Sequence, residues 1–199
     1  MPKLFLSLLL FAGSITVHAG NPENGVTYKF NTDQSIVAWV GHKVTGEHNG
    51  TIAIKEGSLS VVDGMIAGGT VTIDMTTITD LDQEGGGKSK LEGHLKSDDF
   101  FGVATYPTAT LDITKALAKG NGQYTITADL TIKGITNPVT FDANVETVSN
   151  QITATADIKV DRTLYNIRYG SGKFFDNLGD KAIYDVFDLN IKLVAASGK

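Results

Sequence analysis

The sequence predicts an all-β fold: an antiparallel up-and-down barrel of eight strands with one short helix in a connection. Apolar and polar residues alternate in many segments, and turn-forming residues separate these segments at regular intervals. The strand–helix–strand pattern of a parallel sheet is missing. Each strand therefore has one apolar face, and closing the sheet into a barrel leaves no edge unpaired.

The clearest hairpin is expected over residues 124–145. Every second residue is apolar from 124 to 132, and the alternation resumes from 139 to 145. Gly134 tolerates a positive φ, and Pro138 keeps the residue before it extended, so we expect the turn between these two residues. A hairpin alone is marginally stable in water, so its apolar face needs the other strands.

The remaining strands follow the same pattern. Asp63-Gly64 and Asn121-Gly122 are strong signals for tight turns between strands. A polar turn is expected over 46–50, and Glu56-Gly57 is expected to end a strand. Besides the hairpin, strands are expected over residues 26–30, 35–44, 52–54, 59–61, 65–75, 109–113, 152–160 and 183–193.

One segment departs from this regularity. Residues 80–90 are polar, contain three consecutive glycines and are expected to form a mobile loop. Leu91 and Leu95 are four residues apart, as on one face of a helix, which predicts a short helix over 88–97. Residues 161–179 are irregular and rich in aromatic side chains, and Arg162 and Arg168 are expected there as surface ion pairs or over an aromatic ring.

Residues 1–19 have the features of a secretory signal peptide, which leaves one domain over 20–199. Lys3 precedes an apolar stretch that is too short to cross a membrane, and Val17-His18-Ala19 is a small-residue cleavage pattern. The mature chain is therefore expected to be periplasmic or secreted. No later apolar run is long enough to span a bilayer.

Composition excludes several classes of partner. The formal net charge of the whole chain is −5, and loss of Lys3 with the leader makes it more negative, so nucleic acid is an unsuitable partner. The chain has no cysteine, which rules out disulfides and a lipid-modified cysteine anchor. No large exposed apolar pattern is evident, which favours a monomer or a weak homodimer.

The apolar face of the predicted barrel contains many small residues. An eight-stranded barrel can fill its interior with side chains or hold one small ligand. Two hypotheses remain open: the alanines leave a cavity for an apolar ligand, or they pack against aromatic rings from the opposite wall. The small residues on this face are Ala67, Gly69, Ala109, Ala128, Ala143, Ala154 and Ala156.

Three motifs resemble the YceI-like family of exported, lipocalin-like, lipid-binding proteins. They are GHLKSDDFFGVATYP at 93–107, LTIKGITNPVTF at 130–141 and DRTLYNIRYGSG at 161–172, and the resemblance extends over 28–193. It implies an eight-stranded antiparallel barrel that holds a polyisoprenoid chain or an isoprenoid quinone in an elongated cavity. Leu91 and Glu92 stand where the family usually has Arg-Asp, a departure close to the expected cavity mouth.

We expect the ligand to contact the apolar lumen and its mouth, with possible transient contact between the protein and a membrane surface. No cofactor is expected. The candidate ligand-binding residues are Trp39, His42, Val71, Ile73, His94, Phe100, Phe101, Leu111, Ala128, Leu130, Phe141, Ala143, Ala156 and Phe187.

The histidines are the main source of alternatives. His42, His48 and His94 are too far apart in the chain to form a compact metal pair, so no metal site is expected. His42 is a candidate for a polar contact inside the cavity or a core histidine, and a structural role is favoured for His94.

Spacing shows no nucleophile with an attendant base, so a binding protein is expected rather than an enzyme. The alternatives are an enzyme that uses His42 or His94 as acid or base on a lipid or quinone, and an accessory protein with a solid barrel that acts through its surface.

Overall fold

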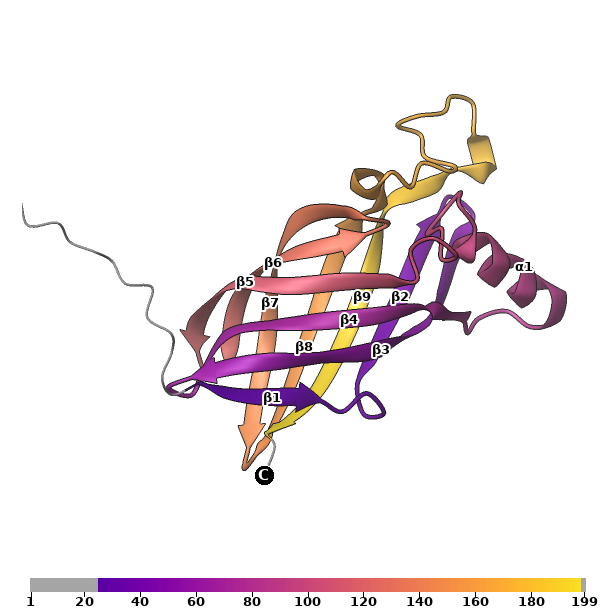
Figure 1. Cartoon of the computed structure of the whole chain (residues 1–199). Coiled ribbons are helices and arrows are strands. Elements are labelled where there is room, and N and C mark those ends of the chain that lie inside the picture. The colour runs from indigo at the N-terminus through magenta and orange to yellow at the C-terminus, as the bar shows by residue number, and fades with distance from the viewer. Residues whose placement is uncertain (1–24, 198–199) are drawn as a thin grey trace, which may run out of the picture.

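The strands of residues 25–197 close into an antiparallel barrel in the computed structural model, which describes these residues (Figure 1). The signal peptide expected over 1–19 lies outside the described residues. The elements are β1 (Val26–Phe30), β2 (Ile36–Lys43), β3 (Gly46–Val62), β4 (Met65–Asp80), α1 (Gly85–Lys96), β5 (Thr108–Gly120), β6 (Gln123–Ile132), β7 (Ile135–Val148), β8 (Gln151–Asp161), the short 3-10 helices η1 (Arg162–Tyr165) and η2 (Gly179–Lys181), and β9 (Ile183–Ser197).

Eight strand positions make up the barrel, which confirms the predicted fold class. Each strand from β2 to β8 pairs antiparallel with the next one, and β9 closes the ring by pairing with β2. The short β1 pairs with the same two neighbours as β2, namely β3 and β9. Strands β1 and β2 therefore share one position in the barrel and are separated by the turn over 31–35.

Two of the predicted tight turns are confirmed by the backbone. Asp63 and Gly64 have φ values of 51° and 76°, and Asn121 and Gly122 have values of 53° and 75°. Residues with positive φ at both central positions match the right-handed twist of the strands that they join.

The turn expected between Gly134 and Pro138 is placed wrongly, because it falls at Lys133 and Gly134, with φ values of 54° and 72°. Pro138 lies inside β7 instead. Strand β8 pairs with β7 only over 143–148, so the missing N–H of Pro138 leaves no hydrogen bond unmade on that side.

Strand β3 runs through both the polar turn expected over 46–50 and the strand end expected at Glu56-Gly57. Its pairing with β4 shifts register at three points, between residues 51 and 53, 54 and 56, and 60 and 61. Bulges of this kind interrupt the regular alternation of side chains without ending the strand. The bulge between residues 54 and 56 lies at the strand end expected at Glu56-Gly57, whereas residues 46–50 pair regularly with β2 after a turn at residues 44–45.

The helix begins at Gly85, so the glycine-rich segment expected to be a loop forms the first turn of α1. The helix ends at Lys96, where the backbone N–H of Ser97 donates to the carbonyl of His94. Leu95 is the buried residue of this helix and packs into the core. Among residues 25–197 no helix has the length and apolar character that crossing a bilayer requires.

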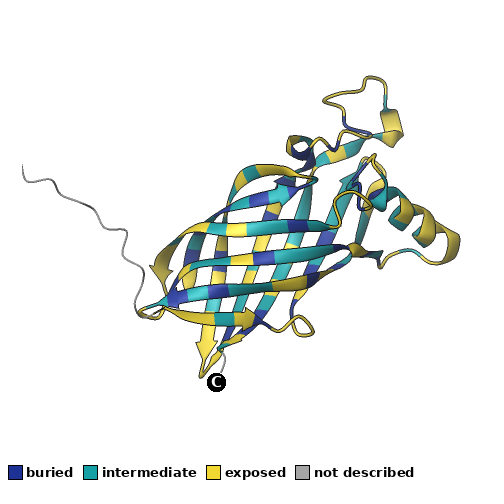
Figure 2. Ribbon diagram, viewed as in Figure 1, coloured by how far each residue is buried: buried dark blue, intermediate teal, exposed yellow. Residues whose placement is uncertain are grey.

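The two ends of the barrel differ in construction. Helix α1 and the connection over 162–182 lie at one end, here called the helix end (Figure 1). Tight turns at 63–64, 121–122 and 149–150 form the other end, here called the hairpin end. Buried and exposed residues alternate along the strands (Figure 2), as in β6, where Tyr124, Ile126, Ala128, Leu130 and Ile132 all point inward.

Candidate functional site

The barrel encloses two apolar voids that lie end to end along its axis. The void toward the hairpin end has a volume of about 110 Å³, and the void toward the helix end has a volume of about 130 Å³. Along β9, Ile191 and Leu193 line the first void, Ile183 and Phe187 line the second, and Leu189 lines both. Together we call the two voids the lumen. The residues shared by both are Val37, Ile73, Leu130 and Leu189.

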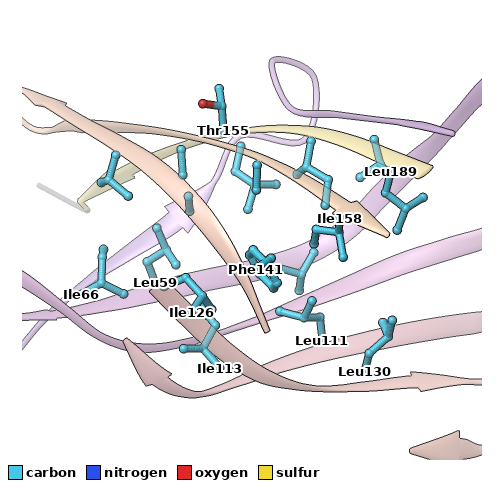
Figure 3. Close-up of a pocket in the computed structure, with 18 of the residues that line it drawn as sticks. Leu59, Ile66, Leu111, Ile113, Ile126, Leu130, Phe141, Thr155, Ile158 and Leu189 are labelled. Carbon is cyan, nitrogen blue, oxygen red and sulfur yellow. The ribbon is translucent and has the colours of Figure 1, made fainter. Parts of the chain in front are cut away.

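The hairpin-end void has a hydrocarbon wall. Its lining residues come from the eight strands β2 to β9 and are all apolar except Thr110 and Thr155 (Figure 3). Ala143, Ala154 and Ala156 form part of this wall on β7 and β8. Since a methyl group reaches less far into the barrel than the branched side chains around it, these alanines contribute to the empty volume of the void.

The helix-end void has a wall of aromatic side chains. Trp39, Phe100, Phe101 and Phe187 line it. The ring centroids of Phe100 and Phe101 are 6.4 Å apart, and Phe101 meets Phe187 edge-on at 6.4 Å. Such contacts are typical of a packed aromatic cluster, which here covers the lumen at the helix end.

Of the two alternatives expected for Arg162, the surface ion pair is wrong and the cation over an aromatic ring is confirmed, because its guanidinium carbon lies 6.0 Å from the centroid of the Phe100 ring. Its side chain is 4% exposed, and the residue is one of those that line the helix-end void. Its N–H groups donate to the carbonyls of Ile167, Ile183 and Tyr184 at 2.9–3.0 Å. Burial lowers the pKa of Arg162, while the nearby charge of Asp185 raises it. Arg162 thus holds a buried positive charge among main-chain carbonyls at the helix end of the barrel.

Arg168 matches the alternative that the sequence left open. Its guanidinium carbon lies 4.8 Å from the centroid of the Phe174 ring. A cation over an aromatic face at the surface contributes about 0.5–1 kcal/mol.

The polar atoms of His42 and His94 are engaged by carboxylates. His42 Nε2 lies 2.8 Å from Asp188 Oδ2, and Nδ1 lies 3.3 Å from Glu47 Oε2. Asp188 stands between Phe187 and Leu189, which both face the lumen, so its carboxylate points to the outer face. His42 contributes to the wall of the helix-end void, but its ring nitrogens contact carboxylates on the outside of the barrel.

His94 does not line either void, in contrast to its prediction as a ligand-binding residue. Its ring packs edge-on against Phe100 and Tyr169, with centroids 4.9 Å and 4.5 Å apart. Its Nε2 lies 3.4 Å from the carboxylate of Asp99. These contacts place His94 behind the aromatic cluster and favour the structural role.

Ala128 also differs from its prediction as a lining residue. Its exposed fraction is 0%, but it borders neither void, because it is flanked by the larger side chains of Ile113 and Val139 on the paired strands. The predicted residues that do line the lumen are Trp39, His42, Val71, Ile73, Phe100, Phe101, Leu111, Leu130, Phe141, Ala143, Ala156 and Phe187.

Sequence reasoning missed several lining residues. Leu59, Ile126 and Ile158 belong to the same alternating apolar faces and could have been found by extending the pattern along each strand. Arg162 could not have been found in this way, because it lies in an irregular connection, where no alternation of apolar and polar residues shows which side chains face inward.

One buried polar group in the helix-end void has no partner. Trp39 is 8% exposed, and its indole Nε1 makes no hydrogen bond within the described part of the chain. A buried donor without an acceptor is costly, and a ligand oxygen is one group that could satisfy it.

An antiparallel barrel of eight positions that encloses an apolar lumen has lipocalin-like architecture. Comparison with known proteins gives the family: the YceI-like domain matches residues 28–195, so the chain belongs to the YceI-like family. A UPF0312 protein of Vibrio campbellii is 32% identical over 142 residues, which cover 67% of this chain and 71% of the relative.

Solved structures share the fold. BcnA of Burkholderia cenocepacia aligns with a TM-score of 0.70 at 22% identity and covers 84% of this chain and 99% of its own. A polyisoprenoid binding domain from Saccharophagus degradans, implicated in plant cell wall breakdown, aligns with a TM-score of 0.64 at 16% identity and covers 87% of this chain and 99% of its own. At these identities the similarity establishes the architecture.

Proposed function

We propose that this protein binds an isoprenoid-type lipid, either a polyisoprenoid or the tail of an isoprenoid quinone, in the lumen of its barrel. The observation that carries the proposal is the pair of apolar voids that lie end to end along the barrel axis and share four lining residues. The elongated shape suits a linear hydrocarbon, and the name of the Saccharophagus degradans structure supports the same ligand class.

The volumes limit how much ligand enters without rearrangement. An apolar cavity of about 150 Å³ accommodates one benzene molecule. The two voids, of about 110 Å³ and 130 Å³, are therefore each close to the size needed for one five-carbon isoprene unit. A longer chain requires the side chains between the voids, or the aromatic cluster at the helix end, to move.

The free energy of transferring a lipid into the lumen suits carriage, storage or sequestration of that lipid. Removing a CH₂ group from water stabilises by about 0.8 kcal/mol, so each buried isoprene unit contributes about 4 kcal/mol relative to water. Moving the same unit from a bilayer, whose interior is equally apolar, yields little net free energy. The protein can therefore take a lipid from a membrane and return it, while keeping it out of water between the two.

The helix end is the proposed site of entry. Tyr169, Phe174, Phe175 and Tyr184 are between 42% and 55% exposed, and all lie in or next to the 162–182 connection. Aromatic side chains favour the interface between a membrane and water. We include transient contact of this end with a bilayer in the proposal, and the unpaired indole N–H of Trp39 as a donor to an oxygen of the lipid head group.

The proposed setting is the periplasm or the exterior of the cell, as the leader expected over 1–19 suggests, with the protein as a monomer or weak homodimer. Binding is favoured over catalysis because the nitrogens of His42 and His94 face carboxylates rather than the lumen. The voids favour binding over a solid barrel that acts only through its surface.

Substitution of Ala156 tests the proposal. Ala156 lines the hairpin-end void, so the ring of Ala156→Phe is expected to occupy this void and reduce uptake of a fluorescent isoprenoid analogue at least tenfold. Ala118→Phe, at an exposed position of β5, is the matched control and is expected to bind as the wild type does. Circular dichroism checks that both variants fold. Unchanged uptake by folded Ala156→Phe would refute the proposed location of the ligand.

A further inference from the structure

We propose that His48, Asp80 and Asp82 form a binding site for one divalent transition-metal cation of the zinc type. The three residues lie on β3, at the end of β4 and in the segment that leads to α1. Sequence spacing did not indicate this site, because His48 is more than thirty positions from Asp80 and Asp82 and meets them only when β3 pairs with β4. The inference does not depend on the proposed lipid binding.

The geometry brings three suitable donor atoms together. A ring nitrogen of His48 and one carboxylate oxygen from each aspartate all lie within 4.8 Å of one another. Tetrahedral zinc bonds nitrogen and oxygen ligands at about 2.0–2.2 Å, which sets them roughly 3.4 Å apart. Small side-chain rotations are sufficient to reach that spacing, with water completing the coordination.

Asp80 is the observation that points to a ligand. Its side chain is 0% exposed, and its Oδ2 makes no hydrogen bond. Its other oxygen lies 3.4 Å from the backbone N–H of Asp82, which is a long contact. A buried carboxylate without a partner is strongly unfavourable, and a cation bound beside it supplies the missing partner.

Protein cations do not fill this role. The ion pairs that Lys and Arg form within residues 25–197 involve other acids: Lys88 pairs with Glu92, for example, and Arg162 with Asp185. Glu92 also accepts hydrogen bonds from Thr79 and from the backbone of Asp80, which adds a third carboxylate next to the cluster. The cluster is thus rich in negative charge.

Neighbouring groups hold the donors in place. The backbone N–H of Asn49 donates to Asp82 Oδ1 at 2.8 Å, and Gln83 Nε2 lies 3.2 Å from His48 Nδ1. His48 Nδ1 itself lies 2.8 Å from Asp82 Oδ2, so the two side chains already face each other. The bond from Asn49 orients the Asp82 carboxylate, and a bound cation would replace the hydrogen bond between His48 Nδ1 and Asp82 Oδ2.

The donor set indicates the class of cation. One imidazole with carboxylates suits zinc and its neighbours in the transition series. Calcium takes six to eight oxygen ligands and magnesium prefers oxygen, so both fit less well. His42 provides a contrast, because Asp188 and Glu47 approach opposite nitrogens of its ring and cannot share one ion with it.

Calorimetric titration of zinc chloride into the chelator-treated mature chain, without a polyhistidine tag, tests the proposal. One saturable site per chain is expected. His48→Gln and Asp80→Asn are each expected to weaken binding at least tenfold, and His42→Gln is the matched control that leaves it unchanged. Because Asp80 is buried and its variant could fail to fold, Asp82→Asn, at a side chain 27% exposed, provides a second test of a carboxylate ligand.

A thermal melt supplies a second readout. Zinc is expected to raise the Tm of the wild type and to leave that of His48→Gln unchanged, since a ligand stabilises only the state that binds it. The proposal is overturned if zinc shows no saturable binding, if its affinity is unaltered in folded His48→Gln and Asp82→Asn, or if calcium binds more tightly than zinc.

Discussion

At the scale of single residues, hydrogen bonds from Arg162 hold the irregular connection over 162–182 against β9. Its planar fork reaches three main-chain carbonyls that come from two different parts of the chain. Lysine carries the same charge but cannot reproduce the fork geometry. The contacts of this side chain could not be predicted, because the alternation of apolar and polar residues ends at Asp161 and only the folded connection determines what an arginine there contacts.

We predict that Arg162→Lys lowers the free energy of unfolding by about 2–3 kcal/mol, because it leaves buried carbonyls without donors. Arg168→Lys is the matched control, and it is expected to cost less than about 1 kcal/mol, since Arg168 stacks on Phe174 at the surface. Urea denaturation of both variants measures the difference. Equal losses would contradict the role given to Arg162.

Asp188 gives a prediction about pH. Lys159 Nζ at 2.7 Å and His42 Nε2 at 2.8 Å lower the pKa of Asp188 below its ordinary value, Lys159 having the larger effect. A carboxyl group whose pKa is lower in the folded state stabilises the fold above its unfolded pKa of about 4, and this stabilisation is lost as the pH falls through the folded value.

Asp188→Asn is therefore expected to destabilise the protein at pH 7 by up to about 1 kcal/mol and to have a smaller effect near pH 3. Denaturation at the two pH values measures this, and a double-mutant cycle with Lys159→Met assigns the effect to the pair. A loss of the same size at both pH values would show that the ionised carboxylate is not responsible.

At the scale of elements, the periodic strands and the tight turns could be predicted because they depend on local chemistry. Asp63-Gly64 and Asn121-Gly122 form turns for reasons contained in two residues. The length of β3 could not be predicted, because its bulges are resolved only by pairing with β4. The position of Pro138 inside β7 likewise depends on where β8 stops pairing.

Substitution of two glycines distinguishes the effect of tight packing on stability from the effect of helix propensity. A Cβ atom at Gly50, in β3, would lie 1.8 Å from the carbonyl oxygen of Thr79 and 2.6 Å from the Trp39 ring. Gly93, in α1, has open space around its Cα. Gly50→Ala is expected to destabilise by about 2 kcal/mol or more through overpacking, and Gly93→Ala to stabilise by about 0.5–1 kcal/mol through helix propensity. Chemical denaturation of the two variants checks the opposite signs, and a shift in the same direction would contradict the close packing of β3 against β4.

At the scale of the whole molecule, the barrel and the small residues on its inner face leave an apolar lumen that is unfavourable for water. Twelve of the predicted ligand-binding residues line this space, because alternation along a strand fixes which side chains face inward. Ala128 and His94 do not, because the depth of a side chain depends on its neighbours on other strands. The cluster of His48, Asp80 and Asp82 could not be predicted because His48 lies far from the two aspartates in the sequence, and only the pairing of β3 with β4 brings them together.

The central claim is that the lumen holds an isoprenoid chain, and the most direct measurement is organic extraction of the purified mature protein followed by mass spectrometry. We predict recovery of an isoprenoid lipid approaching one molecule per chain from the wild type, and markedly less from Ala156→Phe than from Ala118→Phe. Repeated recovery of empty wild-type protein that also fails to take up added isoprenoids would contradict the claim.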